Sequence, residues 1–151
     1  MLGLLLPRGR DQKRGDMAKS KRRSKSKLKS KSKPKSGVVT VAGLKRAIEG
    51  RKASALAGLY ADDAIVQVID RDNPPSNPRH LKGRDAIASY FADVCGRDMT
   101  HKVECGLTVG NRLAFTQSCA YPDGTKVFCS AMIDLKGGKI ARQVVVQAWD
   151  G

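Results

Sequence analysis

The first helical pattern in the chain lies just after a strongly basic N-terminal tail, residues 1–36. Residues 38–49 place Val41, Leu44 and Ile48 at spacings of three and four, which puts them on one helical face. Gly50 interrupts that pattern, as glycine commonly does at the end of a helix. We therefore expect an amphipathic helix with its apolar face buried.

The next forty residues alternate between helix and extended chain. Residues 52–60 predict a short second helix, and AIVQVI at 64–69 favours a strand because it is short and rich in β-branched residues. Three prolines within 71–83 predict a loop. Residues 84–95 return to helical spacing and predict a third helix.

The pattern of residues 100–151 predicts strands separated by tight turns. Turn signals stand at Gly110–Asn111, at PDG (122–124) and at KGGK (136–139). Four strands are expected over 101–109, 112–121, 125–135 and 139–149. Helices followed by an antiparallel run of strands predict an α+β fold in which a curved sheet wraps over the helices and encloses a pocket.

The charge of the chain is concentrated in its first 36 residues. These hold fourteen Lys/Arg against two Asp, a net of +12, whereas residues 37–151 hold fifteen basic and twelve acidic residues, a net of +3. The Lys/Ser repeat is expected to be disordered, with Met17 as an alternative start that would exclude residues 1–16. Its candidate polyanion-binding residues are Lys21, Arg22, Arg23, Lys25, Lys27, Lys29, Lys31, Lys33 and Lys35. The tail is interpreted either as a tether to nucleic acid or an anionic surface, or as a solubilising extension.

The cysteines and the apolar runs indicate the setting of the protein. Cys95, Cys105, Cys119 and Cys129 lack the spacing of a zinc site, so they are expected to fill the core as free thiols, with no metal and no cofactor. The opening apolar run of five residues is too short for a signal peptide, and no stretch is long enough to span a membrane. A reducing, cytoplasmic location is expected.

The order of these segments is similar to that of a known family. LYADDAIV, the Pro-rich loop, GRDAIASYF and the closing GGKIARQVVVQAW resemble the SnoaL-like group of the nuclear transport factor 2-like superfamily. The resemblance covers roughly residues 38–150. It implies a cone-shaped fold with three N-terminal helices packed in a strongly curved, mostly antiparallel sheet, and it implies a homodimer. Because this fold carries isomerases, cyclases, hydrolases and binding proteins, the resemblance does not assign a function.

The catalytic positions of the related ketosteroid isomerases are apolar in this chain. Aligning YADDA (60–64) with that pattern places the general-base aspartate at Val68, and the two oxyanion donors at Leu44 and about Ala131. Valine cannot accept a proton from carbon, and leucine and alanine cannot donate a hydrogen bond to an enolate. The steroid-isomerase mechanism is therefore not expected here.

Strand alternation, phased by the same resemblance, predicts a mostly apolar pocket. The expected lining residues are Val66, Val68, Phe115, Gln117, Cys119, Ala131, Ile133, Gln143, Val145, Gln147 and Trp149, together with Val127 and Cys129. His101 is expected on the same face as Val103, Cys105, Leu107 and Val109. Reversing the phase would instead place the glutamines in a dimer interface.

Asp70 and His101 are the weak catalytic candidates. They form an acid–base pair if the two strand ends converge, since imidazole titrates near neutrality. The alternatives are structural: Asp70 begins the turn DRDNPP, where aspartate commonly accepts backbone hydrogen bonds, and His101 sits at a strand end.

Three functions follow from these observations. The first is a binding protein for a small apolar molecule, oriented by the three glutamines. The second is an isomerase, cyclase or hydratase with a displaced acid/base. The third is a dimeric scaffold whose tail tethers it to a polyanion.

Overall fold

The computed structural model describes residues 37–151, so the basic residues singled out in the tail lie outside the described part. The elements are α1 (Val41–Glu49), α2 (Ala53–Ala57), β1 (Tyr60–Ile69), β2 (Arg79–Lys82), α3 (Arg84–Gly96), β3 (Thr100–Val109), β4 (Arg112–Ala120), β5 (Lys126–Lys136) and β6 (Lys139–Trp149). The predicted α+β class is confirmed. Within residues 37–151, every helix is too short or too polar to cross a membrane.

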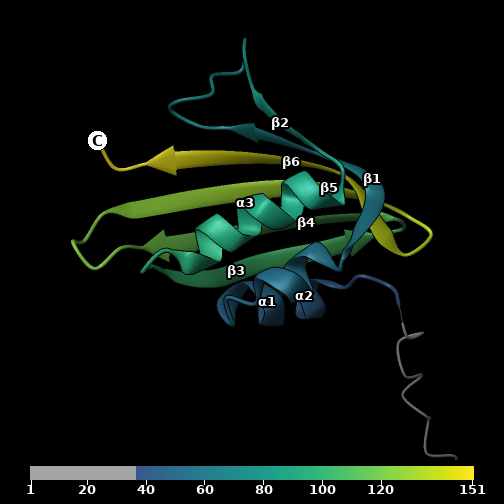
Figure 1. Cartoon of the computed structure of the whole chain (residues 1–151). Helices are drawn as coiled ribbons and strands as arrows, with labels where there is room; N and C mark the ends of the chain where they lie inside the picture. The colour runs from purple at the N-terminus through teal and green to yellow at the C-terminus, as the bar shows by residue number, and fades with distance from the viewer. Residues whose placement is uncertain (1–36) are drawn as a thin grey trace, which may run out of the picture. The chain divides into compact units, whose positions relative to one another are not determined.

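One curved six-stranded sheet organises the described chain (Figure 1). Its strand order is β2-β1-β6-β5-β4-β3, and every neighbouring pair is antiparallel except β1 with β6. The expected meander of the last four strands is confirmed, with bounds within one residue of the predicted ones. Figure 1 shows α3 running along one face of the sheet, with α1 and α2 near its lower part.

Local capping decides where the first helix begins. The Thr40 hydroxyl accepts a hydrogen bond from the backbone N–H of Gly43 at 3.0 Å, so the helix starts at Val41 rather than at residue 38. Leu44, Ala47 and Ile48 form its buried side, which agrees with the predicted amphipathic pattern.

The second helix is shorter than predicted, and its last expected residue belongs to a strand. α2 ends at Ala57 because Gly58 closes the turn, with its N–H bonded to the carbonyl of Ser54. Tyr60 then pairs with Ile140 as the first residue of β1. The expectation that residues 52–60 form one helix was wrong at this end.

The Pro-rich segment contains a strand that the sequence pattern did not indicate. Proline lacks the backbone N–H that a sheet requires, but the residues after Pro78 are free to pair. Arg79–Lys82 therefore forms β2, an edge strand that pairs with residues 65–68 of β1.

A β-bulge at Glu104 reverses the predicted facing of the second half of β3. Val103 lies opposite Gln117 but Cys105 lies opposite Thr116, so one extra residue is inserted between them. Cys105, Leu107 and Val109 consequently point outward: Leu107 and Val109 are 59% and 69% exposed, and Cys105 is exposed rather than part of the core as expected. The expectation that they share an inward face with His101 was wrong, and Gly106 takes the inward position instead.

Candidate functional site

A cavity of about 320 Å³ lies between the sheet and the helices, within the size range of small-molecule sites. All three helices contribute apolar or aromatic side chains to its wall, among them Leu44, Leu56 and Phe91. Three arginines that line it, Arg71, Arg79 and Arg97, are exposed, which indicates where the cavity reaches the surface.

Strand register arranges the inward side chains of the sheet in rows that cross the strands. Residues in one row are direct neighbours on the same face, so the register alone tells which side chains meet. One row consists of His101, Cys119, Val127 and Trp149, and the next consists of Val103, Gln117, Cys129 and Gln147.

Most residues expected in the pocket lie on the cavity wall. Ten of the thirteen line it: Val66, Phe115, Gln117, Cys119, Val127, Cys129, Gln143, Val145, Gln147 and Trp149. The other three, Val68, Ala131 and Ile133, are buried in the core and are not part of the wall. Of the three positions aligned with the isomerase residues, Val68 and Ala131 are therefore closed off, while Leu44 is an apolar part of the wall.

At the most buried part of the wall, Tyr60 donates a hydrogen bond from its hydroxyl to Oε1 of Gln143. Burial strongly raises the pKa of Tyr60, so its phenol stays protonated and remains a donor. Gln143 is only 7% exposed, yet its amide nitrogen has no hydrogen-bond partner among the described residues. This leaves one polar atom of a buried side chain free for a bound molecule.

A second amide lies further along the same strand. Nε2 of Gln147 donates to the hydroxyl of Tyr90 at 3.3 Å, and Oε1 of Gln147 accepts from the indole N–H of Trp149 at 3.3 Å. Burial raises the pKa of Tyr90 as well, so this phenol is also neutral. The wall thus presents neutral hydrogen-bonding groups on an aromatic surface.

His101, Gln117 and Cys119 form a third polar cluster. Nε2 of Gln117 lies 2.9 Å from Nδ1 of His101 and 2.9 Å from Sγ of Cys119, and that sulfur is 3.3 Å from Nδ1. Nε2 of His101 is buried without a partner. The thiol of Cys129 adjoins that of Cys119, and the contact lowers the pKa of Cys119, aided by His101 and Gln117, while it raises the pKa of Cys129.

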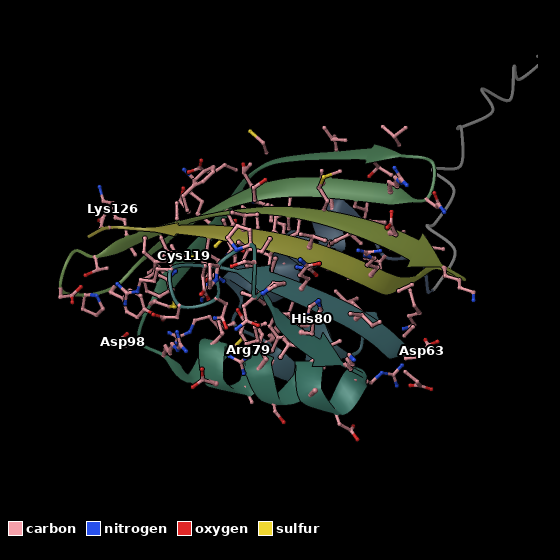
Figure 2. The ribbon with its side chains drawn as sticks, turned by 90° about the horizontal axis from the view of Figure 1, so that it is seen from above. Asp63, Arg79, His80, Asp98, Cys119 and Lys126 are labelled. Atoms are coloured by element: carbon pink, nitrogen blue, oxygen red, sulfur yellow. The ribbon has the colours of Figure 1, made fainter. Side chains whose placement is uncertain are left out.

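Sequence reasoning did not single out this cluster, because the three residues lie on two strands. His101 and Cys119 are eighteen positions apart, and only the antiparallel pairing of β3 with β4 makes them direct neighbours. The register implied by the Gly110–Asn111 turn would have placed His101 opposite Ala120, and the bulge at Glu104 shifts the pairing by one residue so that His101 faces Cys119. Figure 2 shows Cys119 toward the end of the molecule that carries Asp98 and Lys126, away from Asp63.

Arginines rest on aromatic side chains where the cavity opens. The guanidinium of Arg71 lies 4.8 Å from the ring centre of Trp149, and that of Arg79 lies 5.5 Å from the ring centre of Tyr90. Arg97 donates to the hydroxyl of Tyr121 at 3.3 Å. These contacts frame the opening with cations on flat apolar surfaces.

The two weak catalytic candidates line the same cavity but are not bonded to each other. Oδ1 of Asp70 accepts hydrogen bonds from the backbone N–H groups of Asp72 and Asn73 at 2.9 and 2.8 Å, and from the Asn73 amide at 2.8 Å. His101 is engaged instead with Gln117 and Cys119. Among residues 37–151, no group of His, Cys, Asp and Glu is arranged to hold a metal ion.

The comparisons with known proteins agree with this architecture. Residues 41–143 match the SnoaL-like domain, which is more than half of the chain. The protein belongs to the SnoaL-like domain family. A search of curated proteins finds no match.

Similar solved structures share the fold at low sequence identity. A proposed ketosteroid isomerase from Kribbella flavida DSM 17836 is 16% identical with a TM-score of 0.60, covering 71% of this chain and 73% of that one. An NTF-2 like protein of unknown function from Burkholderia xenovorans LB400 is 18% identical, with a TM-score of 0.61 and coverage of 71% and 78%. IdmH, a proposed polyketide cyclase from Streptomyces antibioticus, is 21% identical, with a TM-score of 0.54 and coverage of 71% and 88%.

Proposed function

We propose that the protein binds a small, largely apolar molecule in the cavity. The observation that carries this proposal is the Gln143 amide: a side chain more than nine-tenths buried, held by Tyr60, with its nitrogen unpaired at the cavity wall. The nitrogen itself is not fully enclosed, so it is accessible as a donor to an acceptor on a bound molecule, and a ligand that left it unpaired would incur a free-energy cost.

The other wall residues indicate the character of the ligand. Phenols, amides and apolar side chains supply most of the wall, whereas the charged groups, Arg71, Arg79, Arg97, Asp70 and Asp72, lie at or near its opening. Gln143 and Gln147 are four residues apart on β6, which separates their backbones by about 13 Å at the usual rise of a strand. An elongated apolar molecule with a hydrogen-bond acceptor at the buried end would fit this arrangement.

Native mass spectrometry of the purified full chain tests the proposal. A ligand that co-purifies adds a fixed mass to the folded protein and is released on denaturation. Binding should weaken in Gln143→Leu, which keeps the side-chain size but removes the amide, and should persist in Gln67→Leu, which changes a glutamine of β1 that does not line the cavity. Equal binding by the two variants would contradict the role of Gln143.

The second candidate function is an enzyme with a displaced acid/base. The observation that favours it is the unpartnered, buried Nε2 of His101 beside the cavity, since an imidazole can exchange protons near neutral pH. Asp70, whose Oδ1 is occupied by the loop, would act only through its other oxygen. If a carbonyl ligand is recovered, its incubation with protein in deuterated water should incorporate deuterium, and His101→Gln should abolish this. If the wild type incorporates no deuterium into the ligand, a proton-transfer activity is excluded.

We further infer that the protein pairs with a second copy through the outer face of the sheet. Phe128, Met132 and Val146 are large apolar side chains exposed on neighbouring strands of that face, and Leu107 joins them on β3. A solvated sheet face normally alternates to polar residues, so a contiguous apolar group supports a contact.

The polyanion tether also remains a proposal. It rests on the +12 charge of residues 1–36, and it predicts binding to duplex DNA that weakens steeply as salt is raised. Binding of the full chain should be compared with that of a chain beginning at residue 37 across a salt series. Equal affinities would leave the tail as a solubilising extension.

A further inference from the structure

Cys119 is the feature of the cavity that ligand binding alone does not explain. Its sulfur touches three groups at once: Nδ1 of His101 at 3.3 Å, Nε2 of Gln117 at 2.9 Å, and the thiol of Cys129. A cysteine that merely fills space needs apolar neighbours, whereas these neighbours either accept a proton from the thiol or donate to the thiolate.

The hydrogen bonds assign complementary roles to these neighbours. With Nε2 of Gln117 as the neighbour of Nδ1 of His101, the tautomer that fits carries a lone pair on Nδ1, and this lone pair takes the Cys119 proton when the thiol replaces the amide as its partner. The same amide lies within reach of the sulfur and would stabilise its negative charge. Cys129 keeps its own proton, because its pKa is raised by Cys119 and by burial, and so remains a donor to the neighbouring sulfur.

We propose that Cys119 is a nucleophile, with His101 as its base, that adds to α,β-unsaturated carbonyl compounds entering the cavity. This inference rests on the proposed binding of small apolar molecules, since such compounds are apolar and carry one acceptor oxygen. It uses a thiol and a base within hydrogen-bond distance, which is the arrangement that activates a nucleophile.

The reaction is balanced without any further reagent. The thiol proton passes to Nδ1 of His101, and a sulfur electron pair forms the C–S bond to the β-carbon. The C=C electron pair moves toward the α-carbon and carbonyl oxygen, and the imidazolium then returns the proton to the α-carbon. The product is a neutral thioether adduct on Cys119.

The other cysteines provide internal references for a test. Cys105 is exposed on the outer side of β3, and Cys95 is partly exposed near the end of α3. Cys119 itself is only 5% exposed, so access alone would make it the slower thiol. Preferential reaction at Cys119 can therefore be ascribed to its surroundings.

N-ethylmaleimide, itself an α,β-unsaturated carbonyl compound, is the probe. Full-length protein is treated with less than one equivalent between pH 5.5 and pH 9, and each cysteine is quantified by peptide mass spectrometry. Because the pKa of Cys119 is lowered, its labelling at pH 6 should exceed that of Cys105 by about tenfold or more, a factor that one pKa unit supplies. If Cys105 is labelled at pH 6 and Cys119 is not, the proposal is overturned.

Two variants distinguish the loss of the His101 base from a general effect of replacing a histidine. His101→Gln should reduce labelling of Cys119 at pH 6 about tenfold and shift its pH profile upward, while His80→Gln, the only other histidine, should change neither. Wild-type labelling rates in His101→Gln would contradict the role of His101. The wild-type pH profile remains decisive even if a variant unfolds.

The outcome also separates this inference from ligand binding. The neutral fluorescent probe N-phenyl-1-naphthylamine should bind and protect Cys119 from labelling if both ideas hold. Binding of that probe with an inert Cys119 would overturn the nucleophile and leave the cavity as a binding site. A reactive Cys119 in a protein that binds no probe would overturn the proposed binding function instead.

Discussion

The buried polar side chains Tyr60 and Gln143 are hydrogen-bonded to each other. Tyr60 and Gln143 satisfy each other across β1 and β6, and Tyr60 also packs its ring 5.6 Å from that of Phe91. The hydroxyl is therefore a small polar addition to a side chain that is otherwise part of the core.

Replacing Tyr60 by phenylalanine tests this pair. The ring and its contact with Phe91 are kept, but Oε1 of Gln143 loses its donor, so the free energy of unfolding should fall by about 1–3 kcal/mol. Urea denaturation measures the change. Tyr121→Phe, which removes a hydroxyl from a more exposed pair with Arg97, should change stability by less than about 0.5 kcal/mol. Equal losses in both variants would contradict the buried role of the Tyr60 hydroxyl.

At the scale of secondary-structure elements, the bulge at Glu104 joins β3 to α1. Oε1 of Glu49 accepts a hydrogen bond from the backbone N–H of Val103 at 3.0 Å, and Nζ of Lys45 donates to the carbonyl of Val103 at 3.0 Å. Glu49 and Lys45 also pair with each other. Lys45 and Glu49, which are one helical turn apart, thus form hydrogen bonds with the backbone C=O and N–H of Val103, next to the bulge.

The pH dependence of stability should reveal the Glu49 contact. Lys45, and then the Val103 N–H, lower the pKa of Glu49. A lowered folded-state pKa stabilises the native state above the unfolded pKa, and this contribution is lost as pH falls through the folded pKa. Glu49→Gln should therefore lower the melting temperature at pH 7 and lose less stability than wild type between pH 6 and pH 3. Parallel pH profiles of the two proteins would contradict this assignment.

Gly106 fixes the distance between the same two elements. A Cβ added there would overlap Cγ1 of Val41 on α1. Gly106→Ala should lower the free energy of unfolding by up to about 1–3 kcal/mol, because the partly buried Val41 side chain must move to make room for the added methyl group. Gly96→Ala, at a helix end where a Cβ meets no atom within 4 Å, should be neutral or stabilise by up to about 1 kcal/mol. Chemical denaturation measures the free energy of unfolding of both variants. An unchanged value for Gly106→Ala would show that α1 can move to accommodate the methyl group.

These elements also show how far the sequence could lead. Strands β4, β5 and the part of β6 from Gln143 onward were predictable because alternation determines their inward faces and turns determine their bounds, whereas a bulge interrupts the alternation of β6 before Gln143. The reversal in β3 was not, because a bulge depends on long-range contacts with Glu49 and Lys45 that no local pattern contains. For the same reason, the glutamines of the cavity wall could be named in advance, whereas the His101–Cys119 contact required the pairing of two strands.

At the scale of the whole molecule, the two faces of the sheet have different expected partners: a small ligand inside and a second copy outside. Met132→Lys places a charge in the middle of the outer apolar group formed by Phe128, Met132, Val146 and Leu107. Sedimentation velocity should show a dimer for wild type and a monomer for this variant. Val38→Lys, at an exposed valine before α1, should leave the dimer intact. A wild-type monomer would contradict the inferred pairing.

Binding of a small apolar molecule in the cavity can be measured by fluorescence titration with N-phenyl-1-naphthylamine. Val145 lines the cavity, whereas Val109 is exposed, so Val145→Phe fills the site and Val109→Phe is its matched control. We expect saturable binding to wild type and Val109→Phe, and at least about tenfold weaker binding to a folded Val145→Phe, a loss of about 1.4 kcal/mol. Equal binding to all three proteins, or no binding to wild type, would contradict the proposed binding.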